Sequence, residues 1–207
     1  MVDSAGMERK TYTYDYPRPA VTADTVLMAY PEDPQGPLDA EILLVRRGRE
    51  PFKGRWALPG GFLEEDETLE ACARRELREE TGAETDDFDF VLLGVFDRPD
   101  RDPRGRTVSA AYLVQAPREA FDPAAGDDAA EARFFHVRDL PGEDELAFDH
   151  ADILRDALSL VDAAAGHGGC GCHDGEEDGD CECGCGGHGR HRHGDGDHEC
   201  GCGHHHG

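Results

Sequence analysis

One stretch of this sequence, Gly61–Ala83, constrains the fold more than any other, and it reads GFLEEDETLEACARRELREETGA. Turn residues at 59–61 precede it, and the apolar spacing that follows predicts a helix. Asp66 is placed to cap the start of this helix, and Gly82 is placed to end it in a left-handed conformation. The inward face of the predicted helix is defined by four side chains: Leu69, Cys72, Ala73 and Leu77.

Three glutamates share the apolar side of this predicted helix. With about 100° between successive residues, Glu76, Glu79 and Glu80 fall in a sector that overlaps the apolar one. Carboxylates crowded on an inward face repel one another and lose hydration, which is unfavourable unless a cation lies between them. Hard divalent ions, Mg²⁺ or Mn²⁺, suit such oxygen ligands. An ordinary acidic surface helix is the alternative interpretation, but it does not explain why the acids share the apolar side.

The same stretch resembles the Nudix box, G-x5-E-x7-R-E-U-x-E-E-x-G-U with U apolar, at every fixed position. The matching residues are Gly61, Glu67, Arg75, Glu76, Leu77, Glu79, Glu80, Gly82 and Ala83. The resemblance implies a hydrolase that cleaves nucleoside diphosphates linked to another moiety, with Glu76, Glu79 and Glu80 as ligands of Mg²⁺ or Mn²⁺. It further implies that Arg75 orients these acids, that Glu67 reaches the metal through water, and that Gly61 allows close approach of the backbone.

The rest of the chain predicts an α/β domain. Strands are expected at residues 20–30, 41–46, 56–58, 88–96, 107–116 and 132–137, with a second helix beginning near Asp149. Strands interrupted by two long helices predict helices on both faces of a mixed sheet, which agrees with the α/β/α sandwich that the family resemblance implies. We expect an N-terminal arm or leading strand at 1–17, a Nudix domain at 18–165, and a disordered C-terminal tail at 166–207, which is too poor in apolar residues to bury a core.

The charge balance limits the partners of this chain. Its 46 acidic and 21 basic residues give a formal net charge of −25, which argues against nucleic acid or an anionic membrane as a partner. The same charge predicts a halophilic protein that is stabilised by salt. The chain shows no apolar signal region at its N-terminus and no membrane-spanning stretch, so we expect a cytoplasmic protein whose thiols stay reduced.

Substrate choice is expected to depend on arginines outside the box, namely Arg98, Arg101, Arg104 and Arg106 in one loop and, with a weaker signal, Arg46 and Arg47 at a strand end. A phosphate clamp and local pairing with Asp97, Asp100 and Asp102 account for the loop equally well. For Trp56 we prefer packing over base stacking, and the isolated His136 and His150 are assigned no chemistry. Candidates for the group that takes a proton from water are Glu79, Asp127, Asp128 and Glu131.

Three segments, RDPRGRTVSAAY, AGDDAAEARFF and LAFDHADILRDAL, resemble the ADP-ribose pyrophosphatase branch of the Nudix family. This resemblance implies hydrolysis of ADP-ribose to AMP and ribose 5-phosphate, and it allows a homodimer. The segments are also similar to the Nudix half of transcription regulators that sense ADP-ribose, but those carry a basic winged-helix domain where this chain has an acidic tail. Two alternatives stay open: a pyrophosphohydrolase that sanitises nucleoside triphosphates, and a metal-binding or storage protein that carries a Nudix domain.

The tail carries closely spaced cysteines among many histidines, and these are Cys170, Cys172, Cys181, Cys183, Cys185, Cys200 and Cys202. Their C-x-C steps differ from the C-x2-C step of a structural zinc knuckle, so no folded finger is predicted. Thiolates and imidazoles at this density still predict binding of Zn²⁺ or another soft metal. A solubilising tail of low complexity is the alternative.

Overall fold

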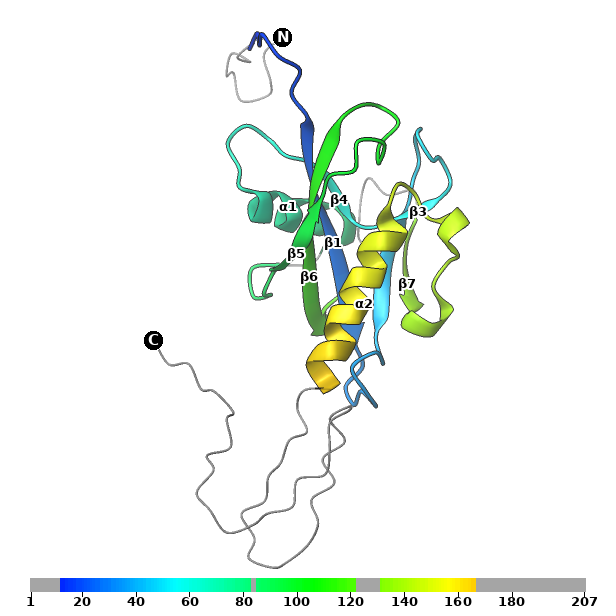
Figure 1. Cartoon of the computed structure of the whole chain (residues 1–207). Helices are drawn as coiled ribbons and strands as arrows, with labels where there is room; N and C mark the ends of the chain where they lie inside the picture. The colour runs from blue at the N-terminus through cyan, green and yellow to red at the C-terminus, as the bar shows by residue number, and fades with distance from the viewer. Residues whose placement is uncertain (1–11, 83–84, 122–130, 167–207) are drawn as a thin grey trace, which may run out of the picture. The chain divides into compact units, whose positions relative to one another are not determined.

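The computed structural model describes residues 12–82, 85–121 and 131–166, all of which lie in the unit Met1–Gly168. A seven-stranded sheet forms its centre (Figure 1). The strands are β1 (Ala20–Tyr30), β2 (Glu41–Arg46), β3 (Trp56–Ala57), β4 (Gly60–Phe62), β5 (Val91–Phe96), β6 (Thr107–Pro117) and β7 (Ala132–His136). Five of them run in the order β3-β2-β1-β6-β5, while β4 pairs with β1 and β7 pairs with β2. The long β1 and β6 pair in parallel and the other pairs are antiparallel, so the sheet is mixed.

Two helices, α1 (Leu69–Thr81) and α2 (His150–Gly166), cover opposite faces of the sheet. Alternate residues of β1 separate the two faces: Val26 packs in one cluster with Ile153 of α2, and Leu27 packs in another with Leu77 of α1. Short 3-10 turns occur at Arg118–Ala120, Val137–Asp139 and Glu143–Glu145. The predicted α/β/α sandwich with a mixed sheet is therefore confirmed.

The ends of α1 differ in how well the sequence predicted them. Gly82 ends the helix in the left-handed conformation, with φ 68°, as expected. The prediction that Asp66 caps the start was wrong, because the cap is Thr68, whose hydroxyl accepts a hydrogen bond from the Ala71 N–H over 3.2 Å. A hydroxyl or carboxylate serves as a cap only from the residue just before the first turn, and Asp66 lies too early in the chain.

Two other boundaries moved. Gly60 and Gly61, expected in a turn, belong to strand β4 because their backbones pair with Asp24 and Ala23 of β1. Strand β5 begins later than residue 88, since Arg74 donates to the carbonyl of Phe88 and holds that segment against α1. Helix α2, by contrast, begins at His150, close to Asp149 as expected.

Within the segment expected to be an N-terminal arm or a leading strand, the described residues 12–17 form no strand. None of the helices in the described ranges is long and apolar enough to cross a membrane. The tail at 167–207, with its seven cysteines, lies outside the described residues, as do Asp127 and Asp128.

Candidate functional site

A pocket of about 380 Å³ opens between the end of α1, strand β1, the segment after β2 and the start of α2. Three acids line it, Asp24, Glu80 and Asp102, and so do five arginines, Arg46, Arg47, Arg49, Arg101 and Arg104. Two phenylalanine rings, those of Phe62 and Phe148, also face it. A concave site with convergent charges of both signs suits a ligand that carries anionic groups together with a cation.

Arg75 organises the glutamates of α1. Its guanidinium lies 2.7 Å from Oε1 of Glu67, 2.7 Å from Oε1 of Glu76 and 3.4 Å from Oε2 of Glu79. The bond to Arg75 is the main reason why the pKa of Glu67 falls to about 2. The expected contact between Arg75 and Glu79 is present, but Arg75 binds Glu67 and Glu76 more closely. One arginine among three carboxylates leaves this cluster, next to the pocket residue Glu80, with an excess of negative charge.

Glu76 and Glu80 occupy the most desolvated positions of this group. Burial raises the pKa of Glu76, and burial followed by the charges of Glu76 and Asp24 raises the pKa of Glu80 well above its usual value. The Oε2 atom of Glu80 is buried and has no hydrogen-bond partner. Glu79 differs, since 56% of its side chain is exposed. The inward stripe of acids predicted from the sequence therefore holds best for Glu76 and Glu80.

The carboxylate of Glu76 leaves no room for a side chain at Gly61. A Cβ atom added there would lie 2.2 Å from Oε1 of Glu76, a distance that no unstrained structure allows. Glycine at this position therefore lets strand β4 approach the carboxylates of α1. The Gly60 amide contributes as well, because its hydrogen bond to Glu80 favours the charged form of that acid.

The donor set fits a hard divalent cation, although the site is not a closed cage. Among the described residues, no three Asp, Glu, His or Cys side chains converge as a complete metal site. The unpartnered buried oxygen of Glu80, with Glu76 and Asp24 near enough to raise its pKa, is nonetheless the kind of group that a cation would satisfy. Mg²⁺ commonly keeps several waters and takes only one or two carboxylates from the protein, so an incomplete cage suits it.

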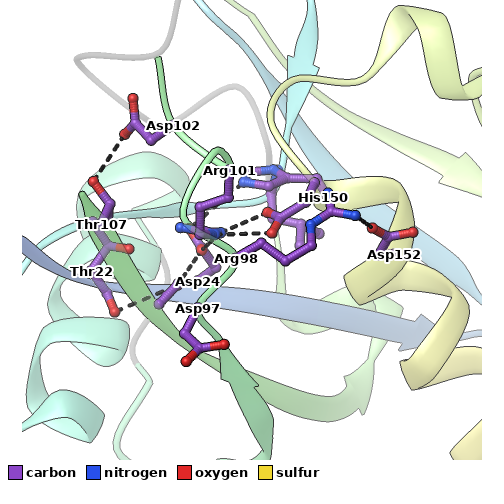
Figure 2. Close-up of polar contacts among 12 residues, drawn as sticks. Thr22, Asp24, Asp97, Arg98, Arg101, Asp102, Thr107, His150 and Asp152 are labelled. Atoms are coloured by element: carbon purple, nitrogen blue, oxygen red, sulfur yellow. Dashed lines mark hydrogen bonds and ion pairs between the residues drawn. The ribbon is translucent and has the colours of Figure 1, made fainter. Parts of the chain in front are cut away.

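Arg101 anchors a second ionic cluster (Figure 2). Its Nε and Nη2 donate to the two oxygens of Asp149 over 2.9 Å and 2.7 Å, and Nη2 lies 3.6 Å from Oδ2 of Asp24. The hydroxyl of Ser109 also donates to Asp24. Only 3% of the Arg101 side chain is exposed. Arg101 lines the pocket, but its guanidinium is buried and paired, and it holds the loop to β1 and the start of α2. Its part in a phosphate clamp stays a prediction.

His150 joins this cluster. Its Nδ1 accepts a hydrogen bond from the Leu58 N–H over 2.8 Å, so in the neutral ring the proton lies on Nε2, which is 4.0 Å from Oδ1 of Asp24. Burial lowers the pKa of His150. The imidazole is thus held neutral with its N–H directed at Asp24.

The other loop arginines have different surroundings. Arg98 reaches α2 and lies 3.2 Å from Asp152, while Arg106 donates to the carbonyl of Asp97, and neither lines the pocket (Figure 2). Arg104 alone of the four combines a pocket position with a half-exposed guanidinium, which is bound by Asp102. Arg46 lines the pocket and lies 3.2 Å from Glu131. Of the arginines predicted to form the clamp, Arg46 and Arg104 combine a pocket position with a partly exposed side chain.

Several pocket residues escaped the sequence interpretation, and these are Thr22, Asp24, Phe62, Phe148 and His150. Asp24 gave one usable signal, since an aspartate in the middle of the apolar segment AVTADTVLMAY must find partners when the strand is buried. No comparable signal marked His150. The preference for packing at Trp56 is confirmed, because its ring packs on the core and meets Phe135 edge-on at 4.9 Å.

Comparisons with known proteins agree with this geometry. The NUDIX domain family matches residues 8–157. An ADP-ribose pyrophosphatase from Methanocaldococcus jannaschii is 43% identical over 143 residues, which cover 68% of this chain and 74% of that protein.

Two solved structures share the fold. The NUDIX domain of Shewanella oneidensis NrtR complexed with ADP ribose superposes with a TM-score of 0.58 at 29% identity, covering 72% of this chain and 94% of that one. A bifunctional NMN adenylyltransferase/ADP ribose pyrophosphatase from Francisella tularensis, complexed with AMP and a Mn ion, gives a TM-score of 0.55 at 31% identity. That match covers 72% of this chain but 43% of the Francisella enzyme, and this chain spans 65% of a related protein from Enterococcus faecalis.

Proposed function

This chain belongs to the Nudix family, and on that premise we propose that it hydrolyses ADP-ribose to AMP and ribose 5-phosphate with Mg²⁺ or Mn²⁺ as its cation. The substrate is supported by the Methanocaldococcus relative and by the Shewanella structure that holds ADP ribose. The cation is supported by the Mn ion of the Francisella enzyme.

One observation in this chain carries the proposal. The buried, unpartnered Oε2 of Glu80 lies in a pocket wall beside Glu76 and Asp24, and arginines line other parts of the same pocket. A diphosphate needs both carboxylates and arginines. The carboxylates hold the cation that neutralises the attacked phosphate, and the arginines donate hydrogen bonds to the remaining anionic oxygens. Neither a purely acidic nor a purely basic pocket would supply the two together.

The residues near the pocket have different proposed roles in this reaction. Glu76, Glu79 and Glu80 are the proposed ligands, and a divalent cation bound there would lower the pKa of a water and neutralise phosphate charge. Arg75 forms short ion pairs with Glu67 and Glu76. These ion pairs orient both carboxylates and favour their charged forms. Gly61 lets the backbone of β4 lie against Glu76.

The reaction consumes one water for each ADP-ribose. The water oxygen forms a bond to one phosphorus, the bond from that phosphorus to the bridging oxygen breaks, and the bridging oxygen leaves with the other phosphate. The proton lost by the water needs an acceptor, for which Glu79 and Glu131 are the described candidates. Glu79 has the exposed carboxylate, whereas Glu131 lies against Arg46.

A substrate panel tests the proposal. Purified protein is incubated with Mg²⁺ and equal concentrations of ADP-ribose, other nucleoside diphosphate sugars and nucleoside triphosphates, and phosphate monoester products are quantified. We expect the highest kcat/KM for ADP-ribose. A higher kcat/KM for any nucleoside triphosphate would contradict the proposal and would favour the sanitising pyrophosphohydrolase instead.

For the C-terminal tail we propose binding of Zn²⁺ or a similar soft metal, on the density of cysteine and histidine in its sequence. The role would be separate from hydrolysis. Full-length protein and a chain ending at residue 165 are titrated with Zn²⁺ against a chelator under reducing conditions. Equal zinc binding by the two forms would remove the tail as a metal site, and loss of hydrolysis with the tail would contradict its separate role.

For the assembly and the partners we propose a cytoplasmic homodimer that does not bind nucleic acid. The dimer is supported by the edge strand β5, whose Val91, Leu92 and Val95 side chains are exposed. Light scattering of the wild type and of Val95→Lys tests the dimer, and a monomeric wild type would contradict it.

The absence of nucleic acid binding rests on the net charge of −25. Retention of the protein on DNA at physiological salt would contradict it.

A further inference from the structure

Two guanidinium groups converge on one aromatic ring in the pocket. The Cζ of Arg47 lies 4.7 Å from the centroid of Phe148, and the Cζ of Arg104 lies 5.5 Å from the same centroid. All three residues line the pocket. Two positive charges held this close repel each other. Burial is the main cause of the lowered pKa of Arg47, and the charge of Arg104 is the next largest cause. Such an arrangement is favourable when an anion lies between or beside the two groups.

Arg47 makes no direct ion pair with the described residues, although Asp102, Asp24 and Glu50 are near enough to raise its pKa. Its Nε donates to the carbonyl of Pro51 over 2.8 Å, and neither terminal amino group makes a hydrogen bond or ion pair there. Its neighbours in the pocket differ in this respect, because Arg46 pairs with Glu131 and Arg101 pairs with Asp149. Arg47 therefore presents a half-buried charge with free donors in the pocket.

Arg104 is held in a fixed position beside it. Its Nε and Nη2 bind the buried carboxylate of Asp102 over 3.0 Å and 2.7 Å, and its guanidinium also lies 5.0 Å from the ring centroid of Phe62. These contacts use one edge of the guanidinium and leave Nη1 without a hydrogen-bond partner in the described structure. A group oriented in advance loses little entropy when it binds a ligand.

The backbone at Phe148 supports a functional reason for this geometry. Phe148 has φ 54° and Phe52 has φ 62°, and these are the non-glycine residues with positive φ among those described. Their rings meet edge-on at 4.9 Å. Left-handed conformations are unfavourable for such residues and persist where the surrounding structure enforces them, which is commonly at ligand sites. The strained pair places the Phe148 ring under the two arginines.

We propose that Arg47 and Arg104, together with the ring of Phe148, form the binding site for the phosphate of the substrate that the cation does not hold. The inference rests on the proposed function and deepens it. A guanidinium presents paired N–H donors that match two oxygens of a phosphate. After hydrolysis the same site holds the phosphate monoester that remains there, so it selects phosphate esters and slows their release.

The test measures binding without turnover. Full-length protein in EDTA is titrated by calorimetry with ribose 5-phosphate and with AMP, and ribose and adenosine serve as ligands that lack the phosphate. Arg47→Gln and Arg104→Gln are compared with Arg133→Gln, which removes the same charge from an exposed residue of β7 that does not line the pocket. We expect both pocket variants to weaken binding of at least one phosphate ester by about tenfold or more, and Arg133→Gln to leave it unchanged.

Arg47→Lys serves as a second variant at the same position. It keeps the charge but loses the planar pair of donors, so its affinity should fall between those of the wild type and Arg47→Gln. Thermal melts confirm that each variant is folded, and Arg47→Lys keeps the test valid if a glutamine variant does not fold. Equal affinity of the wild type, Arg47→Gln and Arg47→Lys for both esters would overturn the site, and so would a wild type that binds neither ester at millimolar concentration.

The outcome is independent of the reaction proposed above. Loss of ester binding in the Arg47 variants supports the site even if ADP-ribose proves a poor substrate in the panel. Unchanged ester binding overturns the site even if ADP-ribose is hydrolysed efficiently.

Discussion

Two clusters in this molecule place an arginine among carboxylates, and they differ in what they leave unpaired. Arg75 is partly exposed and contacts three glutamates, whereas Arg101 is almost fully buried and contacts two aspartates. In the Arg75 cluster the negative charge exceeds the positive by two, and nearby Glu80 adds an unpartnered oxygen. In the Arg101 cluster, Asp149 accepts hydrogen bonds from Nε and Nη2 of the guanidinium. Ser109 and His150 lie beside Asp24.

The difference separates a binding role from a structural one. Surplus carboxylates next to the pocket residue Glu80 favour a cation, so the Arg75 cluster is suited to ligand binding. The Arg101 cluster joins the loop at 97–106 to β1 and α2 through satisfied contacts. An arginine in a conspicuous motif is therefore interpreted correctly only when its partners are known.

The largest expected effect is on turnover at the Arg75 cluster. Glu80→Gln removes a ligand charge with little change of volume, and we expect kcat to fall by about a thousandfold or more. The fold should be retained or stabilised, because the change removes a buried carboxylate whose pKa is already raised. Turnover and a thermal melt on the same preparation measure both effects. Near-normal kcat at saturating Mg²⁺ would show that Glu80 is not a ligand.

The next effect is on stability at the Arg101 cluster. Arg101→Met leaves Asp149 and Asp24 buried without their cationic partner, and we expect a loss of about 3–5 kcal/mol in the free energy of unfolding. Arg98→Met is the matched control, because Arg98 comes from the same loop and pairs with Asp152 of the same helix at an exposed position. Its loss should stay below about 1 kcal/mol. Similar denaturation midpoints for the two variants would contradict the structural role.

A smaller effect is expected in the pH dependence of stability. Because burial lowers the pKa of His150, the folded protein keeps this ring neutral while the unfolded chain protonates it below about pH 6.5. The contribution of His150 to stability is therefore present above that pH and is lost as the pH falls below it. His150→Gln, whose amide oxygen can accept from the Leu58 N–H, should reduce the fall in Tm between about pH 7.5 and 5.5. An unchanged slope would contradict the neutral, buried histidine.

The smallest expected effect is a general one of salt. With a formal net charge of −25, we expect the Tm to rise modestly from dilute buffer to molar KCl, since screening reduces repulsion among the acids. Arg98→Met and the wild type should respond alike. A melting temperature that stays flat or falls with added KCl would count against this electrostatic account.

The sequence predicted those parts of the fold that depend on local pattern. Strands β1 and β2 begin and end as expected, because β-branched and apolar runs bounded by turn residues identify them. Gly82 ended α1 as predicted, since few residues other than glycine adopt the left-handed conformation readily. The acids of α1 could be placed for the same reason, because they share one helix.

The rest of the site depends on contacts between distant segments. Asp24, Arg101 and His150 come from three separate elements, and no spacing in the sequence relates them. Local pattern therefore could not show that Arg101 is buried, or that Arg47 lacks a direct ion pair while Arg46 has one. The Phe148 ring was equally hidden, because its position follows from a backbone conformation that phenylalanine rarely adopts.

The most direct test of the central claim is a Mn²⁺ titration of the full-length protein, followed by the electron paramagnetic resonance signal of free Mn²⁺. The wild type, Glu80→Gln and Arg98→Met are compared in the same buffer, so that any binding by the C-terminal tail is common to all three. We predict that Glu80→Gln weakens one Mn²⁺ site by about tenfold or more, while Arg98→Met matches the wild type. Identical Mn²⁺ binding by the wild type and Glu80→Gln would contradict the claim that the carboxylates around Arg75 hold the catalytic cation.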